Sequence, residues 1–172
     1  TWAISTARPS PASGGNAVLA VDLATVSDQR LISPPIALPA GQSPVTLRFW
    51  NDQTLERRDA TSCWDGGLLE ISTDNGANWT QLPNAAMLTQ PYTGPLFAGP
   101  GNGLQAWCGD PVPYVNSIVD VDAYAGQTVR FRWRVSTDTT VGRVPHGWYV
   151  DDIRVQACAG DSIFADGFES AP

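Results

Sequence analysis

The 172-residue sequence has few of the groups that perform catalysis. It contains one histidine and three cysteines, and charged residues make up only 16% of it. A nucleophile activated by histidine would have to use His146, which lies in a Pro-His-Gly sequence just before a predicted strand. No Gly-x-Ser-x-Gly or His-Glu-x-x-His motif accompanies it, and the cysteines and histidine lack zinc-ligand spacing. The sequence therefore predicts a protein that is not itself an enzyme.

Long hydrophobic runs and positive charge are also scarce. No run of 18 apolar residues occurs, so we expect no membrane-spanning helix. The net charge is −7 at pH 7, and such an acidic surface repels phosphate, which argues against nucleic acid as a partner and favours divalent cations. The chain starts at Thr1 without a signal peptide, as expected of a mature product or an excised fragment. Together with the low charge, this predicts a secreted, extracellular protein.

Turn-forming residues and short alternating segments dominate what is present. The 16 glycines and 14 prolines favour turns over long helices. Apolar and polar residues alternate with the two-residue period of strands in several segments, namely 17–22, 30–38, 45–50, 67–73, 78–82, 117–121, 128–135 and 148–155. We therefore expect an all-β fold, an antiparallel two-sheet jelly-roll sandwich over residues 1–158. Residues 51–63 are expected to form a loop, residues 83–116 a long irregular insertion, and residues 159–172 a C-terminal tail.

One turn carries a recognisable motif. Ser72-Thr-Asp-Asn-Gly-Ala-Asn-Trp79 fits Ser-x-Asp-x-Gly-x-x-Trp, the Asp-box. In this motif the aspartate accepts hydrogen bonds from backbone N–H groups of the turn, and the tryptophan packs beneath it. The motif is a folding device, and one copy does not predict a sialidase propeller. The chain has seven tryptophans, most of which we expect to be buried or half-buried.

The carboxylates predict a metal site. Asp151 and Asp152 are adjacent on a predicted central strand, so strict alternation would point one of them inward. An inward carboxylate is costly unless it is paired or binds a metal, and Ca²⁺ prefers six to eight oxygen ligands. We therefore expect a structural Ca²⁺ site with ligands drawn from Asp22, Asp28, Glu56, Asp65, Asp151 and Asp152. Hydrogen-bonded structural carboxylates and a glycosidase-type pair are the alternatives.

The cysteines predict one disulfide. Cys63 and Cys108 both lie in irregular segments next to tryptophans. In an oxidising compartment the simplest pairing joins them and fixes the 83–116 insertion to the 51–63 loop. Cys158 would then remain unpaired or bond to a residue outside this chain.

Three segments together resemble a known family. They are residues 64–79, from Trp64-Asp-Gly-Gly to Trp79, residues 121–135, from Val121-Asp-Ala-Tyr to Val135, and Gly147-Trp-Tyr-Val-Asp-Asp-Ile153. The set resembles the MAM-like jelly-roll domain of immune-inhibitor-A-type metalloproteases, over roughly residues 17–158. Similar modules follow the catalytic domains of other secreted bacterial proteases, and cleaved-adhesin domains are related.

The resemblance implies a two-sheet jelly roll that is often stabilised by calcium and is not catalytic. Glu56 and Asp65 match the family's acidic positions, although this sequence inserts residues 57–63 between them. The tail, Asp161-Ser-Ile-Phe-Ala-Asp-Gly-Phe-Glu169, looks like a segment found at the ends of secreted bacterial proteins.

We therefore expect an accessory C-terminal module of a secreted hydrolase, in particular a protease, that aids stability, secretion or substrate adhesion. Its partners would be the parent catalytic domain or an extracellular protein or polysaccharide. The alternative is a stand-alone carbohydrate- or protein-binding jelly roll.

Overall fold

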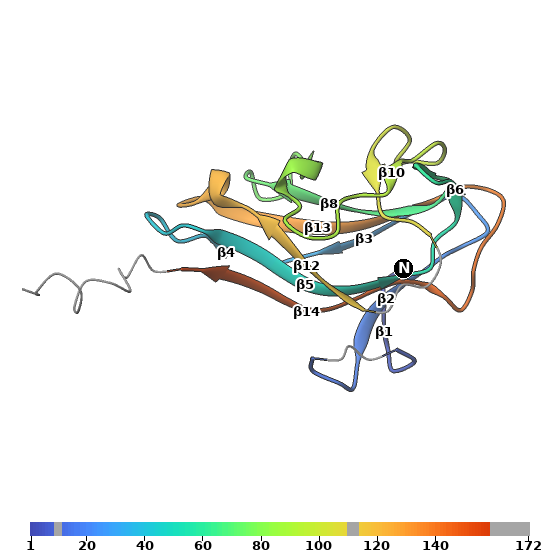
Figure 1. Ribbon diagram of the computed structural model, residues 1–172, viewed down its shortest axis with the longest axis horizontal. Coiled ribbons are helices and arrows are strands. Elements are labelled where there is room, and N and C mark those ends of the chain that lie inside the picture. The colour runs from blue at the N-terminus through green and yellow to red at the C-terminus, as the bar shows by residue number, and fades with distance from the viewer. Residues whose placement is uncertain (9–11, 110–113, 159–172) are drawn as a thin grey trace, which may run out of the picture.

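The chain forms two antiparallel β-sheets that stack as a sandwich (Figure 1). The computed structural model describes residues 1–8, 12–109 and 114–158. The first sheet, called here the β5 sheet, has the strand order β1 (Ala3–Ser5), β2 (Ala17–Val21), β14 (Gly147–Ala157), β5 (Val45–Gln53) and β12 (Val115–Asp120). The second, the β13 sheet, has the order β3 (Ser27–Ile32), β13 (Thr128–Thr137), β8 (Gly66–Ser72) and β9 (Thr80–Gln81), with β4 (Ile36–Ala37) also paired to β13.

The chain crosses repeatedly from one sheet to the other. It passes from β2 to β3, from β4 to β5 and from β5 to β8, and then from β9 to β12, β13 and β14. Apart from the pairs β1–β2 and β8–β9, neighbouring strands within each sheet are therefore distant in sequence. This alternation is the jelly-roll arrangement, and the predicted all-β fold class is confirmed. The described residues include two 3-10 turns, Asn84–Ala86 and Asp122–Tyr124, and no helix long and apolar enough to cross a membrane.

Aromatic side chains from both sheets fill the space between them. Phe49 on β5 and Trp133 on β13 meet edge to face, with ring centroids 5.6 Å apart. Trp148 on β14 packs on Trp107 from the long insertion at 5.6 Å. All seven tryptophans are buried or half-buried, as the sequence predicts. Such rings bury large apolar areas, so this interior is the main source of stability.

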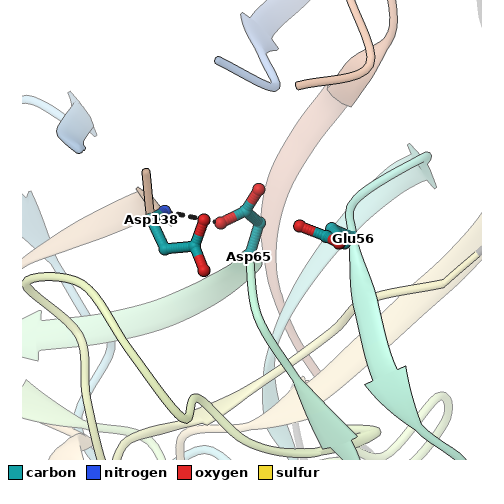
Figure 2. A group of neighbouring side chains, drawn as sticks. All are labelled: Glu56, Asp65 and Asp138. Carbon is teal, nitrogen blue, oxygen red and sulfur yellow. Dashed lines mark hydrogen bonds between the residues drawn. The ribbon is translucent and has the colours of Figure 1, made fainter. Parts of the chain in front are cut away.

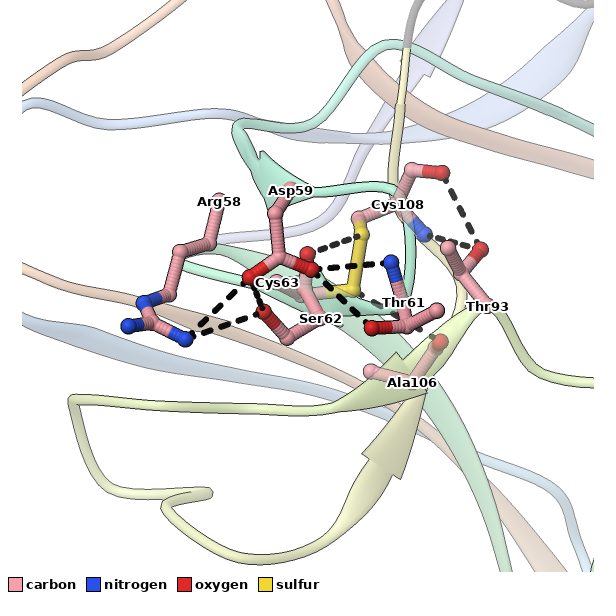
Figure 3. Close-up of a disulfide and its surroundings, with 8 residues drawn as sticks. All are labelled: Arg58, Asp59, Thr61, Ser62, Cys63, Thr93, Ala106 and Cys108. Carbon is pink, nitrogen blue, oxygen red and sulfur yellow. Dashed lines mark hydrogen bonds and ion pairs between the residues drawn. A yellow bond between two sulfur atoms is a disulfide. The ribbon is translucent and has the colours of Figure 1, made fainter.

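The long insertion is partly regular and is fixed by the disulfide (Figure 3). Its strands β10 (Gly94–Pro95) and β11 (Gln105–Ala106) form a small hairpin. Cys63 and Cys108 are bonded, with their Cα atoms 5.9 Å apart, which confirms the predicted pairing, and Cys158 is free and exposed. The 51–63 segment, expected to be a loop, instead extends β5 to Gln53 and forms the hairpin of β6 (Arg57–Asp59) and β7 (Ser62–Cys63). The hairpin was not predicted because the polar composition of this segment is typical of a loop.

The Asp-box has the structural role predicted for it. The carboxylate of Asp74 accepts hydrogen bonds from the backbone N–H of Asn78 at 2.8 Å and from the Ser72 hydroxyl at 2.7 Å. Trp79 donates its indole N–H to the carbonyl of Gly76 at 3.0 Å. The hydrogen bonds, led by those from Asn78, lower the pKa of Asp74 to about 2. The motif closes the β8–β9 turn.

Strand β14 departs from strict alternation. Up to Asp151 its residues pair with β5 in one register, and from Arg154 onward the register has moved by one residue. Asp152 sits in this bulge with a φ of +50°, a left-handed conformation that aspartate tolerates better than most residues. Asp151 and Asp152 are both half-buried. The argument that one of these two carboxylates must point inward is therefore wrong, because the bulge absorbs the extra residue.

Candidate functional site

Four carboxylates gather at one end of the sandwich, where the loops after β2 and β13 lie on the right of Figure 1. They come from Asp22 after β2, Glu56 after β5, Asp65 before β8 and Asp138 after β13. Carboxylate oxygens of Glu56, Asp65 and Asp138 lie within 4.8 Å of one another (Figure 2). Asp22 adjoins Asp65 closely enough for the two side chains to share a proton.

Backbone hydrogen bonds bring these loops together. The carbonyl of Glu56 accepts the N–H groups of both Trp64 and Asp65, each at 3.1 Å. Glu56 and Asp65 are thus held side by side at the base of the β6–β7 hairpin, and the inserted residues 57–63 do not separate them. The N–H of Asp22 donates to the carbonyl of His146 at 2.9 Å, which fixes the end of β2 against the loop before β14.

The hydrogen bonds of the side chains leave several oxygens unused. Asp65 accepts the backbone N–H of Asp138 through Oδ1 at 2.6 Å (Figure 2), but its Oδ2 is buried without a hydrogen-bond partner. Asp22 has no exposed surface, and among the described residues no donor reaches either of its carboxylate oxygens, whose neighbour is the carboxylate of Asp65. Asp138 accepts the N–H and the hydroxyl of Thr140 through Oδ1. Unpartnered buried carboxylate oxygens are costly, so the cluster needs a cation or protons.

The electrostatics reflect this crowding. Burial, followed by the closeness of Asp65, raises the pKa of Asp22 to about 8. Burial also raises the pKa of Asp65 to about 6, and burial and the charge of Asp138 raise the pKa of Glu56. Arg143 opposes the shift at Asp22 through its charge. One guanidinium cannot balance four carboxylates, so without a metal the pair Asp22 and Asp65 retains a proton near neutral pH.

This donor set fits a hard divalent cation. Ca²⁺ takes six to eight oxygen ligands in flexible geometry; Asp65 groups with Glu56 and Asp138, and Asp22 lies beside Asp65. The three grouped residues, Glu56, Asp65 and Asp138, are all carboxylates, and no histidine or cysteine is part of this group within the described residues. Such an all-oxygen set is typical of Ca²⁺ or Mg²⁺ rather than zinc.

Three of the six residues expected to bind metal lie elsewhere. Asp28 accepts hydrogen bonds from Arg134 and Arg30, which lower its pKa although burial acts to raise it. Asp151 accepts the hydroxyl of Ser13 at 3.0 Å, and Asp152 lies 3.4 Å from Arg154.

Register separates the aspartates of β14 from the cluster. Asp151 is five residues along β14 from His146, the backbone partner of Asp22. At about 3.3 Å per residue, that places it roughly 16 Å away, too far to share an ion with Asp22.

Sequence reasoning missed Asp138. It lies three residues beyond the predicted strand 128–135, and this position near a strand end was the available signal. Which strand ends meet at one end of a sandwich depends on topology, which the sequence pattern leaves open.

Comparison with known proteins adds no family assignment. No protein-family model matches the chain, and no curated protein is significantly similar to it in sequence.

Proposed function

We propose that this chain is a non-catalytic accessory module of a secreted bacterial hydrolase, in particular a protease, and that its fold is stabilised by a structural Ca²⁺. One observation carries the calcium part of the proposal. Asp22 is wholly buried without a described hydrogen-bond donor to either carboxylate oxygen, and it adjoins Asp65, which groups with Glu56 and Asp138. An ion there would join the ends of β2, β5 and β13 to the start of β8, and so clamp both sheets at one end.

Two observations support a non-catalytic role. The carboxylates with the most strongly raised pKa values, Asp22 and Asp65, have no exposed surface, so a substrate could not reach them. His146 is hydrogen-bonded through its backbone to Asp22 and Arg143. Burial raises the pKa of Asp52 although the charges of Arg8 and His146 act to lower it, and this carboxylate is already paired with Arg8. A general base must lie within hydrogen-bond reach of the group it deprotonates.

The disulfide supports an extracellular setting. Cys63–Cys108 closes a loop of 45 residues, and such bonds persist mainly in oxidising compartments. The resemblance to protease-associated jelly rolls then supports a parent hydrolase, with its catalytic domain or an extracellular polymer as partner.

The proposal is tested by metal analysis and thermal melts. We expect elemental analysis to find about one calcium per chain, and melting temperature to rise with CaCl₂ and fall with a chelator, whereas MgCl₂ at equal concentration gives a smaller rise. Peptide and glycoside hydrolysis assays should show no activity. Turnover that survives repeated purification would refute the accessory role, and a melting temperature insensitive to chelator would refute the calcium site.

The alternative, a stand-alone binding module, is favoured by a different feature, a pocket on the outer face of the β5 sheet.

A further inference from the structure

The bulge in β14 places two arginines opposite each other. Before the bulge, Asp151 pairs with Trp50, and an unbroken register would set Ile153 opposite Arg48. The extra residue instead sets Arg154 opposite Arg48. Directly opposed side chains lie about 5 Å apart at Cβ, and like charges in this position are destabilising.

The left-handed backbone of Asp152 forms the bulge that sets the two arginines opposite each other. Its positive φ is a strained conformation for a residue other than glycine, and bulges often re-aim side chains beside binding sites. The bulge also restores alternation beyond itself, because Val155 and Ala157 then face the core while Arg154 and Gln156 face outward. The bulge therefore keeps two arginines opposite each other on an exposed face, where an anionic ligand would offset the repulsion that the contact of Arg154 with Asp152 relieves only in part.

A pocket of about 110 Å³ lies at this position. Its lining includes Arg48 and Trp50 from β5, Asn116 from β12, and three residues of β14, namely the acidic Asp152 together with Arg154 and Gln156. The three strands are neighbours in the β5 sheet, so these side chains project from one continuous surface. Pockets that enclose a whole drug-sized ligand measure roughly 300–1,000 Å³. This one accommodates a single group of a larger ligand.

Polar atoms in the pocket lack partners. Among the described residues, the Nε of Arg48 is buried with no hydrogen-bond acceptor, and no described carboxylate forms an ion pair with this arginine. The side-chain oxygen of Asn116 is buried with no donor. Arg154 meets Asp152 at 3.4 Å, but Arg154 is 63% exposed, so that contact contributes little. The pocket thus presents two guanidinium groups and one carboxylate, a net positive charge, beside the Asn116 oxygen.

These two needs define the chemistry of a ligand. Guanidinium groups bind carboxylate and other oxyanions through two parallel hydrogen bonds, so Arg48 and Arg154 select an anion. A bare anion carries no donor for the Asn116 oxygen, whereas a sugar hydroxyl does. The half-buried indole of Trp50 offers a surface on which the apolar face of a sugar ring can pack.

We propose that the pocket of Arg48, Trp50, Asn116 and Arg154 binds an acidic saccharide, with a uronate carboxylate on the two guanidinium groups and a ring hydroxyl donating to Asn116. The small pocket would hold one uronate unit while the polymer extends over the outer face of the β5 sheet. This inference rests on the proposed non-catalytic role and gives the adhesion part of it a ligand class. It does not depend on the calcium site, which lies at the end of the sandwich.

The test is calorimetric titration of the full chain with a galacturonate hexamer and, in parallel, with its fully methyl-esterified form, which keeps every hydroxyl and loses the charge. We expect the acid to bind and the ester to bind at least about tenfold more weakly, because hydrogen bonds to charged groups are the stronger ones. Arg154→Gln and Arg48→Gln should each weaken binding of the acid by about tenfold or more. Arg57→Gln, the same change at an exposed arginine on β6, should leave it unchanged.

The outcomes that would overturn the inference are specific. Equal binding of acid and ester would exclude the arginines as the determinant. If dextran sulfate binds more tightly than the hexamer, the preferred anion is a sulfate and the proposed carboxylate ligand is refuted. If poly-glutamate binds as tightly as the hexamer, the site does not require a saccharide. If Arg57→Gln weakens binding of the hexamer as much as Arg154→Gln does, binding depends on the overall charge of the protein and not on the pocket.

Melting temperatures show whether a variant that fails to bind the saccharide is still folded and still stabilised by Ca²⁺. Arg154 is largely exposed, so Arg154→Gln should have the same melting temperature as the unsubstituted chain. Binding that fails in a chain still stabilised by Ca²⁺ would refute the saccharide site and leave the calcium site intact.

Discussion

Removing metal from the acidic cluster should make the stability of the protein fall as pH rises. An unfolded aspartate has a pKa near 3.9, whereas burial beside Asp65 raises the pKa of folded Asp22 to about 8. Between these values the folded chain keeps a proton that the unfolded chain releases. Stability is therefore greatest below the unfolded pKa, declines as pH rises, and the loss is complete above about pH 8.

The size of this loss follows from linkage. Where the folded chain binds one proton more than the unfolded chain, the free energy of unfolding falls by roughly 1.4 kcal/mol per pH unit. From pH 5 to pH 8, Asp22 therefore lowers the free energy of unfolding of the chelated protein by roughly 4 kcal/mol. Asp65, whose pKa is raised to about 6, acts in the same direction over the lower part of that interval. For a chain of this size we expect the melting temperature to fall on the order of 10 °C. Bound Ca²⁺ should offset much of this loss, adding about 2.7 kcal/mol at a hundredfold excess over its dissociation constant.

The substitution Asp22→Asn separates the two effects because their signs are opposite. Without metal at pH 8 it removes a costly buried charge, so it should raise the melting temperature above that of the unsubstituted chain. With saturating CaCl₂ it removes a ligand, so it should lower the melting temperature. Asp151→Asn makes the same change roughly 16 Å from the cluster and should do neither.

The assay is differential scanning calorimetry at pH 5, 6.5 and 8, in chelator and in CaCl₂, on the three proteins. A chelated chain that melts at the same temperature at pH 5 and pH 8 would refute the raised pKa values. Equal responses of Asp22→Asn and Asp151→Asn to calcium would refute the assignment of the site to Asp22.

Three other features of the fold give testable expectations. Replacing Cys63 and Cys108 by serine should cost about 4 kcal/mol in urea unfolding, from the chain entropy of a 45-residue loop, with faster hydrogen exchange in residues 84–106 than in the sheets; uniform acceleration would contradict this. Glu70→Ala should cost roughly 3–5 kcal/mol, because it leaves two nearly buried arginines of β13 without their shared carboxylate, and a change under about 1 kcal/mol would argue against that network. Asp74→Ala should accelerate hydrogen exchange at the N–H of Asn78, a protection that in the unsubstituted chain is present above pH 4 and lost as pH falls towards 2; unchanged exchange would show that the carboxylate does not close the turn.

The sequence identified most of the architecture because local patterns determine it. Alternation marked β5, β8, β13 and β14, and the Asp-box located the β8–β9 turn. The short strands β10 and β11 were not foreseen, since each has two residues and is held by the disulfide and by the packing of Trp107. A two-residue strand has no period to detect.

The acidic cluster was foreseen only in part, for a reason of topology. Asp22, Glu56 and Asp65 each follow or precede a recognisable strand, so their residue type and position were informative. That Asp138 joins them depends on β13 ending at the same end of the sandwich as β2 and β5, which no local pattern states. Long-range sheet order, rather than the identity of the ligands, limited the prediction.

The bulge in β14 explains why alternation wrongly predicted an inward carboxylate on this strand. Strict alternation would have turned Asp152 and Arg154 towards the core, where two unpaired charges are costly. One inserted residue with a left-handed backbone avoids that cost and turns Arg154 outward, opposite Arg48. The same adjustment that removes an inward carboxylate thus creates an outward pair of guanidinium groups. The chemistry expected of this strand changes accordingly from binding a cation inside the sandwich to binding an anion on its surface.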